Sequence, residues 1–341
     1  MSETPRVILV AGATGVQGRS FIEALKPEGS APPAFRVLAL TRQPDSQSAK
    51  DLASSNQHVQ VVQGDLDKPE TIRKVFVDAG GEGAIYGVFC VLAFPGLGKD
   101  AEGEEKQGKS LADIALEYKV QHYIFSSYER GGTSMDHVLK LDRKAKFDIE
   151  NYVMALGDKG LPWTIIRPTF FMENFLGSIG RVTATVLRVG LKEDTKVNLV
   201  AAKDIGSVAA AVFQNPEKTK GRAMSITSDH VTTAEIEASY KRGTGKDIPS
   251  VPNFVGRALL AINAHARGVT EDIERVHEMI SNPTDDTYRL SQELTDDIHP
   301  QKTTFEQWSR DLVEKGKRDE AETPKKGWNG VSLLHLLQGK L

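Results

Sequence analysis

Short apolar runs alternate with amphipathic stretches through the first half of the chain. The apolar runs are rich in β-branched residues and almost continuously hydrophobic, which is typical of parallel strands covered by helices on both faces. They predict six strands, over Arg6–Val10, Arg36–Thr41, Val59–Gln63, Ala84–Leu92, Tyr123–Ser126 and Trp163–Arg167. The stretches between them predict helices over Gln17–Leu25, Pro69–Ala79, Glu104–Tyr118 and roughly Met135–Leu156. This alternation predicts an α/β fold, a Rossmann-type doubly wound parallel sheet with right-handed crossovers.

The pattern is less regular in the second half. It predicts a short strand over Gly221–Thr227. It also predicts helices over Lys203–Pro216, Asn253–Ser281 (one or two helices) and Thr303–Lys317. Another helix is expected to begin at a capping Thr232 or Thr233 and to end at Gly243. We therefore expect residues 1–160, with the strand at 163–167, to form the Rossmann domain. Residues 168–341 would form a smaller mixed α/β region with C-terminal helices, which binds a substrate or a partner.

Composition and charge narrow the possible partners. A chain of 341 residues can form one large α/β domain with an appended part, or two compact domains. A net charge of −3 gives no reason to expect nucleic acid as a partner. The N-terminus has no charged-then-apolar leader, and no segment has the roughly 18 successive apolar residues that span a bilayer. We expect a cytoplasmic protein without a membrane or nucleic-acid partner.

Residues that hold metals or form disulfides are sparse. Cys90 is the single cysteine and lies in an apolar run, so it predicts a buried, unreactive thiol. The eight histidines show no short metal-ligand spacing, and we expect no metal site. A Gly-x-Ser-x-Gly elbow is absent, so hydrolase chemistry lacks its nucleophile.

The segment "GATGVQG" carries the strongest functional signal. It places Gly12, Gly15 and Gly18 directly after the first strand and at the start of the first helix. In this context the first glycine permits a tight turn, the second lets backbone approach a pyrophosphate, and the third permits close helix–strand packing. Amides at the helix N-terminus then face the phosphate charge. The pattern favours a dinucleotide site over a purely structural turn.

The end of the second strand indicates which dinucleotide. An NAD site usually has a carboxylate here to accept a hydrogen bond from the ribose 2′-hydroxyl. This chain has Thr41 and Arg42, and no carboxylate before Asp45. An arginine matches a 2′-phosphate, so NADP(H) is favoured as cofactor, the alternative being a solvated arginine. Asp65 is expected at the adenine edge, with Asp67 as a helix cap.

Five segments together resemble the NmrA-like family of atypical short-chain dehydrogenases/reductases, which includes isoflavone-reductase-like enzymes and NADP-sensing regulators. They are "ILVAGATGVQGRSFIEAL", "VLALTRQP", "VVQGDLDKPETI", "RPTFFMENF" and "AAKDIGSVAAAVF". The resemblance covers roughly Pro5 to Asp247. It implies that residues 1–160 form an NADP-binding domain.

The resemblance also implies contacts with each part of the dinucleotide. The residues expected at the pyrophosphate are Gly12, Thr14, Gly15, Val16 and Gln17. Those expected at the adenosine end are Arg42 at the 2′-phosphate, Asp65 and Leu66 at the adenine, and Ala93, Phe94 and Pro95 under the ribose. Those expected around the nicotinamide and the substrate are Ser127 and Tyr128, Lys146, and Pro168 to Phe171. For Phe171, a place in the core is an equal alternative.

The catalytic pair of most short-chain reductases is missing. Those enzymes protonate the substrate with a tyrosine whose pKa is lowered by a lysine four residues later, and no tyrosine here has such a lysine. Lys146 remains as an acid or electrostatic stabiliser, with Tyr128 as a source of the missing hydroxyl. The other lysines considered are Lys109, Lys140 and Lys144. An ion pair with Glu150 is the non-catalytic alternative for Lys146.

Two functions remain open. The first is an NADPH-dependent oxidoreductase that reduces a hydrophobic, conjugated or aromatic small molecule by hydride transfer, and we favour it. The second is a non-catalytic NADP(H)-sensing regulator that acts through protein–protein contacts, favoured by the missing pair and the extra C-terminal helices. The apolar tail "GVSLLHLLQGKL" could dock on its own domain or on a neighbour.

Overall fold

A computed structural model describes residues 4–27, 29, 33–93, 101–132, 136–139, 141–284 and 286–316. Its main feature is a seven-stranded sheet of order β3-β2-β1-β4-β5-β6-β9, in which all neighbouring strands are parallel. The strands are β1 (Arg6–Ala11), β2 (Phe35–Thr41), β3 (Val59–Gln63), β4 (Gly87–Cys90), β5 (His122–Ser126), β6 (Trp163–Pro168) and β9 (Arg222–Ile226). This confirms the predicted Rossmann-type α/β fold.

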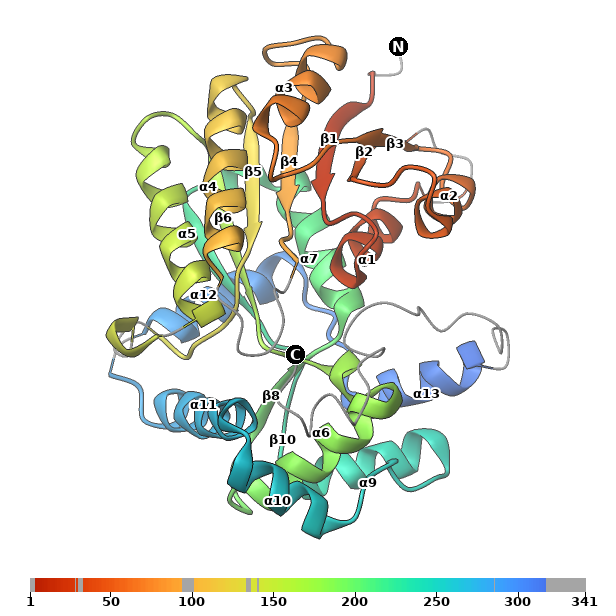
Figure 1. The fold of residues 1–341 in the computed structure, drawn as a ribbon, viewed down its shortest axis with the longest axis vertical. Helices are drawn as coiled ribbons and strands as arrows, with labels where there is room; N and C mark the ends of the chain where they lie inside the picture. Colours follow the sequence, from red (N-terminus) through yellow and green to blue (C-terminus); the bar gives the residue numbers. More distant parts are fainter. Residues whose placement is uncertain are drawn as a thin grey trace.

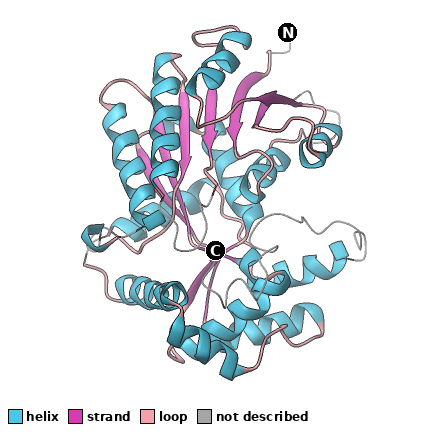
Figure 2. Ribbon diagram, viewed as in Figure 1, coloured by secondary structure: helices cyan, strands magenta, loops and turns pink. Residues whose placement is uncertain are grey.

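Helices cover both faces of this sheet (Figures 1 and 2). On one face lie α3 (Pro69–Asp78), α4 (Glu102–Glu117) and α5 (Leu141–Gly157). On the other lie α1 (Val16–Ala24), α2 (Gln47–Ser54), α7 (Ala202–Gln214) and α12 (Thr287–Ile298). Two buried clusters result, one on each side, because strands covered on both faces are apolar on both. Cys90 lies in one of them as predicted, and burial raises the pKa of its thiol to about 12.

A smaller α/β part is built from the C-terminal half, as expected. Its three-stranded sheet has the order β10-β8-β7, with β7 (Phe170–Phe171), β8 (Val197–Val200) and β10 (Asp229–Val231). Its helices are α6 (Gly177–Gly190), α9 (Thr233–Thr244), α10 (Asn253–Ile262), α11 (Ala264–Ser281) and α13 (Phe305–Gly316). Short turns of helix complete the described chain, at Asp136–Val138, Met172–Phe175 and α8 (Pro216–Thr219). In Figure 1 the smaller part lies below the main sheet.

The second half contributes to both parts. β6 leads into β7 through Thr169 alone, so the carboxyl end of the main sheet continues directly into the smaller one. The chain then returns, because β9 pairs with β6, while α7 and α12 pack on the main sheet. The sequence predicts a strand at β9 but assigns it to the second half rather than to this sheet.

Some predicted element ends were wrong. The helix that begins at Thr232 ends at Gly245, whose φ of +73° suits glycine, and not at Gly243. Gly243 instead permits close approach of α13, since a Cβ there would lie 2.6 Å from the carbonyl oxygen of Glu306. The helix predicted from Met135 begins at Leu141.

Four helices, α2, α6, the short α8 and α12, were not predicted. The C-terminal tail that the sequence analysis singled out lies outside the described residues. Among the described helices, none has the length and apolar character that a membrane span requires.

Candidate functional site

The glycine turn links β1 to α1 and needs its glycines for two different reasons. Gly12 has a φ of +80°, and a Cβ there would lie 2.4 Å from the carbonyl oxygen of Val91. Gly18 packs against the turn itself, since its Cβ would lie 2.3 Å from the carbonyl oxygen of Gly12. A Cβ on Gly15 would meet one neighbour only, 3.2 Å away, and Gly15 is exposed. The turn therefore presents bare backbone to solvent at its centre.

The helix that follows begins without a side-chain cap. Gly15 is the N-cap of α1 and forms no side-chain hydrogen bond, so the first amides of the helix are available to an anion. The Gln17 side chain accepts a hydrogen bond of 2.7 Å from the Ser126 hydroxyl and thereby ties the turn to the end of β5. The side-chain oxygen of Gln17 is therefore engaged within the protein.

Arg19 also holds the glycine turn in place, a role that the sequence analysis missed. Its guanidinium donates to the carbonyl oxygen of Thr14 at 3.0 Å and to that of Ser48 at 2.9 Å. These two bonds join the turn to α2. Both acceptors are main-chain carbonyls from separate segments, so no local sequence pattern marks the contact.

On the β2–β3 side of the turn, a cavity of about 570 Å³ lies between these two strands and α3, and extends from Arg36 near the start of β2 to Arg42 just after its end. Arg42 and Asp65, predicted for the adenosine end of a dinucleotide, both line it. The strands bring them together because Thr41 pairs with Gln63, and the amide of Gly64 donates to the carbonyl oxygen of Thr41 at 3.0 Å.

The loop after β3 is held by backbone hydrogen bonds around Asp65. Its amide donates to the Thr71 hydroxyl oxygen at 2.9 Å, and its carbonyl oxygen accepts from the amide of Lys68 at 2.8 Å. The N-cap of α3 is Lys68, so the expectation that Asp67 caps this helix was wrong. The Asp67 amide instead donates to the Asp65 carboxylate at 3.2 Å.

On the other side of the turn, a second cavity of about 180 Å³ lies between the main sheet and the smaller part. It is lined from the main sheet by Tyr128 and Pro168, both predicted for the nicotinamide and substrate end. The smaller part adds an apolar wall of Phe170, Val197, Val269, Ile273 and Val276. Phe171, for which pocket and core were both considered, packs against the sheet core instead.

The polar wall of this second cavity was missed by sequence reasoning. Asp272 on α11 forms ion pairs with Arg143 on α5 and with Arg275, the latter at 2.6 Å. All three residues line the cavity. Arg143 and Asp272 are far apart in the sequence, and no motif connects them.

Tyr128 lines the cavity, while its hydroxyl is enclosed by protein. Within the described residues that oxygen has no hydrogen-bond partner. Burial raises the pKa of Tyr128 well above its usual value, so the phenol keeps its proton at neutral pH. It can donate a hydrogen bond but cannot serve as a base.

Lys146 lies on α5 and pairs with Glu104 of α4, not with Glu150 as the non-catalytic alternative supposed. Glu104 is almost fully buried, and the Lys146 side chain is 16% exposed. Two other candidate lysines are engaged in more exposed ion pairs, Lys109 with Glu105 and Lys144 with Asp148. Lys140 lies outside the described residues.

Glu150 is the centre of a buried ionic cluster. Its carboxylate accepts hydrogen bonds from Arg167 at 2.6 Å and 3.1 Å and from Arg130 at 3.1 Å. Arg130 also pairs with Asp136. Burial alone would raise the pKa of Glu150, but the guanidiniums, that of Arg167 first, outweigh burial and hold this pKa below its usual value.

The remaining predicted site residues that the structure describes follow the carboxyl ends of strands. Val16 is exposed at the start of α1, and Leu66 packs against the core on the α3 side. Ser127 is buried after β5, where its amide donates to the carbonyl oxygen of Ile166. Ala93 is exposed at the end of its described segment. Phe94 and Pro95 lie outside the described residues.

Comparison with known proteins agrees with the resemblance in the sequence. The model of the NmrA-like family matches residues 4–308. The NmrA-like family domain-containing oxidoreductase FrzB of Cladobotryum sp. is 30% identical over 303 residues, which cover 79% of this chain and 82% of that protein.

Two solved structures share the fold, each with a TM-score of 0.63. One is NmrA, a negative transcriptional regulator in complex with NAD, which is 20% identical and aligned over 94% of this chain and 99% of its own. The other is the Citrobacter sp. triphenylmethane reductase complexed with NADP(H), 18% identical over 90% of this chain and 99% of its own. Together with the family match, the fold and the glycine turn, these findings show that the chain belongs to the NmrA-like family.

Proposed function

We propose that this chain is an NADPH-dependent oxidoreductase that reduces a hydrophobic, conjugated or aromatic small molecule. The observation that carries the proposal is the uncapped glycine turn that follows β1. Strand order reverses between β1 and β4, and ligands of doubly wound sheets bind outside the strand ends at such a point. The names of an oxidoreductase relative and of a reductase with the same fold support this class of activity.

The proposal assigns each half of the dinucleotide to one cavity. The pyrophosphate would lie on the backbone of Gly12 and Gly15 and at the start of α1. The adenosine half would enter the cavity lined by Arg42 and Asp65, and the nicotinamide would lie towards Pro168. Bare backbone at Gly15 suits a bulky phosphate, because a side chain at this position would occupy the space proposed for the pyrophosphate. When bound, reduced nicotinamide supplies the hydride.

The substrate would occupy the second cavity, whose walls are mostly apolar. Phe170 and Ile273 provide the surface for a conjugated ring, and the protein around the cavity excludes water from the hydride acceptor. Lys146, held by Glu104, would orient the nicotinamide ribose and stabilise negative charge that develops on the substrate. Tyr128 stays protonated and would contribute its ring to the wall.

Turnover is tested by measuring NADPH consumption with quinones, enones and imines. We expect activity with at least one class, and its loss in Lys146→Gln but not in Lys109→Ala. Lys109 is the matched control because it also pairs with a glutamate of α4 but is more exposed. Since Glu104 is buried, thermal unfolding of Lys146→Gln must first establish that the variant is folded. Equal activity of both folded variants would remove Lys146 from the mechanism.

A second candidate function is a sensor of the NADP(H) redox state. It is favoured by the enclosed hydroxyl of Tyr128, which leaves no tyrosine acid facing the cavity, and by the name of the regulator that shares this fold. A sensor should bind NADPH and NADP⁺ with different affinities and turn over none of the compounds tested. Equal affinities combined with turnover would exclude it.

A further inference from the structure

The first cavity contains more positive charge than the sequence analysis assigned to it. Four cationic side chains and two carboxylates line it: Arg36, Arg42, Lys68 and Lys74, and Asp65 and Asp78. Of these four cations, only Arg42 is predicted from the sequence to bind a phosphate.

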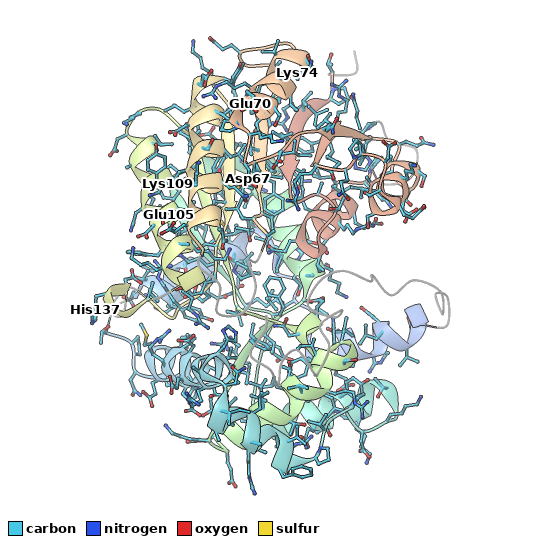
Figure 3. The ribbon with its side chains drawn as sticks, in the orientation of Figure 1. Asp67, Glu70, Lys74, Glu105, Lys109 and His137 are labelled. Carbon is cyan, nitrogen blue, oxygen red and sulfur yellow. The ribbon has the colours of Figure 1, made fainter. Side chains whose placement is uncertain are left out.

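Arg36 and Lys74 are not placed to bind the same phosphate as Arg42. Arg36 lies near the start of β2, six residues before Arg42, which follows the end of that strand; the separation is about 20 Å at 3.3 Å per residue. Lys74 lies six residues along α3 from Lys68, about 9 Å further from the strand ends, and pairs with Asp78 at 2.9 Å. Figure 3 shows this separation, with Asp67 just before α3 at one end and Lys74 towards the other.

Lys68 is different, because the loop after β3 folds back on itself. Its amide donates to the carbonyl oxygen of Asp65, which returns Lys68 to the carboxyl end of the strand, beside the end of β2. Arg42 and Lys68 are both exposed and line the same cavity. Within the described part of the chain, neither side chain has an ion pair.

Charge requires a second cation if a phosphate binds here. A phosphate monoester carries between one and a half and two negative charges at neutral pH, as a rough value. Asp65 adds another negative charge to the same cavity. Arg42 alone would leave the sum of these charges negative. Arg19 is not among the residues that line this cavity.

We infer that Lys68 is a second determinant of NADP(H) over NAD(H), binding the 2′-phosphate from the α3 side while Arg42 binds it from the β2 side. The inference rests on the proposed function, since it requires the adenosine half to lie in this cavity. It adds a cofactor contact from the loop between β3 and α3, which is separate from the glycine turn and from the end of β2.

The test measures dissociation constants of NADPH and NADH for the full chain by titration. We expect Lys68→Ala to weaken NADPH binding about tenfold and to leave NADH binding unchanged, because NADH lacks the 2′-phosphate. Lys68→Arg should retain the preference. Lys74→Ala is the matched control, a lysine of the same cavity and helix that should change neither constant. Adenosine 2′,5′-bisphosphate should compete with NADPH less well in Lys68→Ala than in the wild type.

Each other result has a distinct meaning. Unchanged NADPH affinity in Lys68→Ala, or an equal loss for NADPH and NADH, overturns the role of Lys68 while leaving the proposed function intact. Equal affinity of the wild type for NADPH and NADH also overturns it. Failure of the wild type to bind either dinucleotide overturns the proposed function, and the inference with it.

Discussion

At the scale of single residues, a cluster of buried, paired charges adjoins residues that line the second cavity, since Arg130 follows Glu129 and Arg167 precedes Pro168. Glu150 on α5 is fully buried between Arg130, in the loop after β5, and Arg167, at the end of β6. Such a cluster costs solvation free energy to form, but removing one member costs more, because an uncompensated charge is left inside the protein. The cluster therefore fixes where the loop after β5 meets the end of β6.

We predict that Glu150→Gln lowers the free energy of unfolding by about 3 kcal/mol or more, since it leaves two buried guanidiniums short of negative charge. Urea denaturation measures this directly. Glu105→Gln is the control, because its ion pair with Lys109 is about a third exposed and should contribute less than about 1 kcal/mol. Similar small losses in both variants would contradict the argument.

The difference in unfolding free energy between the wild type and Glu150→Gln should depend on pH. The pKa of Glu150 is lower in the folded than in the unfolded chain, so its stabilisation is present above the unfolded pKa of about 4.3. It is lost as the pH falls through the folded pKa. The stability difference between the wild type and Glu150→Gln should therefore narrow from neutral pH towards pH 3. A difference that widens on acidification would show that the pKa shift has the opposite sign.

At the scale of elements, helix α1 is positioned by its contact with α7. The two helices approach closely at Gly206, where a Cβ would lie 2.3 Å and 2.4 Å from the carbonyl carbon and oxygen of Ser20. Glu173 anchors the start of α7 from the smaller part, since its carboxylate accepts from the amide of Ala202 at 3.1 Å. It also accepts from the indole of Trp308 on α13 at 3.2 Å. The start of α1, which would face the pyrophosphate, is thus held by elements from both halves of the sequence.

We predict that Gly206→Ala destabilises the protein by about 1–3 kcal/mol, because backbone rather than a flexible side chain occupies the space of the new methyl group. The variant should also bind NADPH less tightly, since α1 must move. Thermal unfolding and titration measure the two effects.

Gly103→Ala is the matched control for that prediction. Gly103 also lies within a helix, α4, but a Cβ there meets nothing within 4 Å. This change should leave stability unchanged or raise it by about 0.5–1 kcal/mol, because alanine favours the helix. Equal destabilisation by both substitutions would rule out the α1–α7 contact as the cause.

At the scale of the whole molecule, the second cavity lies where the two parts meet. Helix α11 closes it, and its contacts with the main part are few. Arg143 of α5 pairs with Asp272, and Gly131 after β5 approaches α11 so closely that a Cβ would lie 3.2 Å from that of Met279. The opening of α11 away from the sheet would therefore expose the cavity without unfolding either part.

We predict that Asp272→Asn increases hydrogen exchange in α11 up to about tenfold, which corresponds to about 1.4 kcal/mol of local opening free energy. Exchange in β1 and β4 should stay unchanged. Glu278→Gln on the same helix is the control, because its pair with Lys192 is exposed and lies outside the cavity lining. Faster exchange in the strands as well would indicate global destabilisation rather than local opening of α11.

The sequence by itself determined the features that depend on neighbouring residues. Six parallel strands follow from continuous apolar runs, and the glycine turn follows from three glycines between a strand and a helix, since both depend on local backbone and burial. Arg42 and Asp65 could be placed together because equivalent strand ends meet at one edge. Only the tertiary structure decided the rest. It placed β9 in the main sheet, paired Lys146 with Glu104 and brought α11 over the second cavity. These contacts join residues far apart in the chain, and no local pattern encodes which distant side chain satisfies a buried charge.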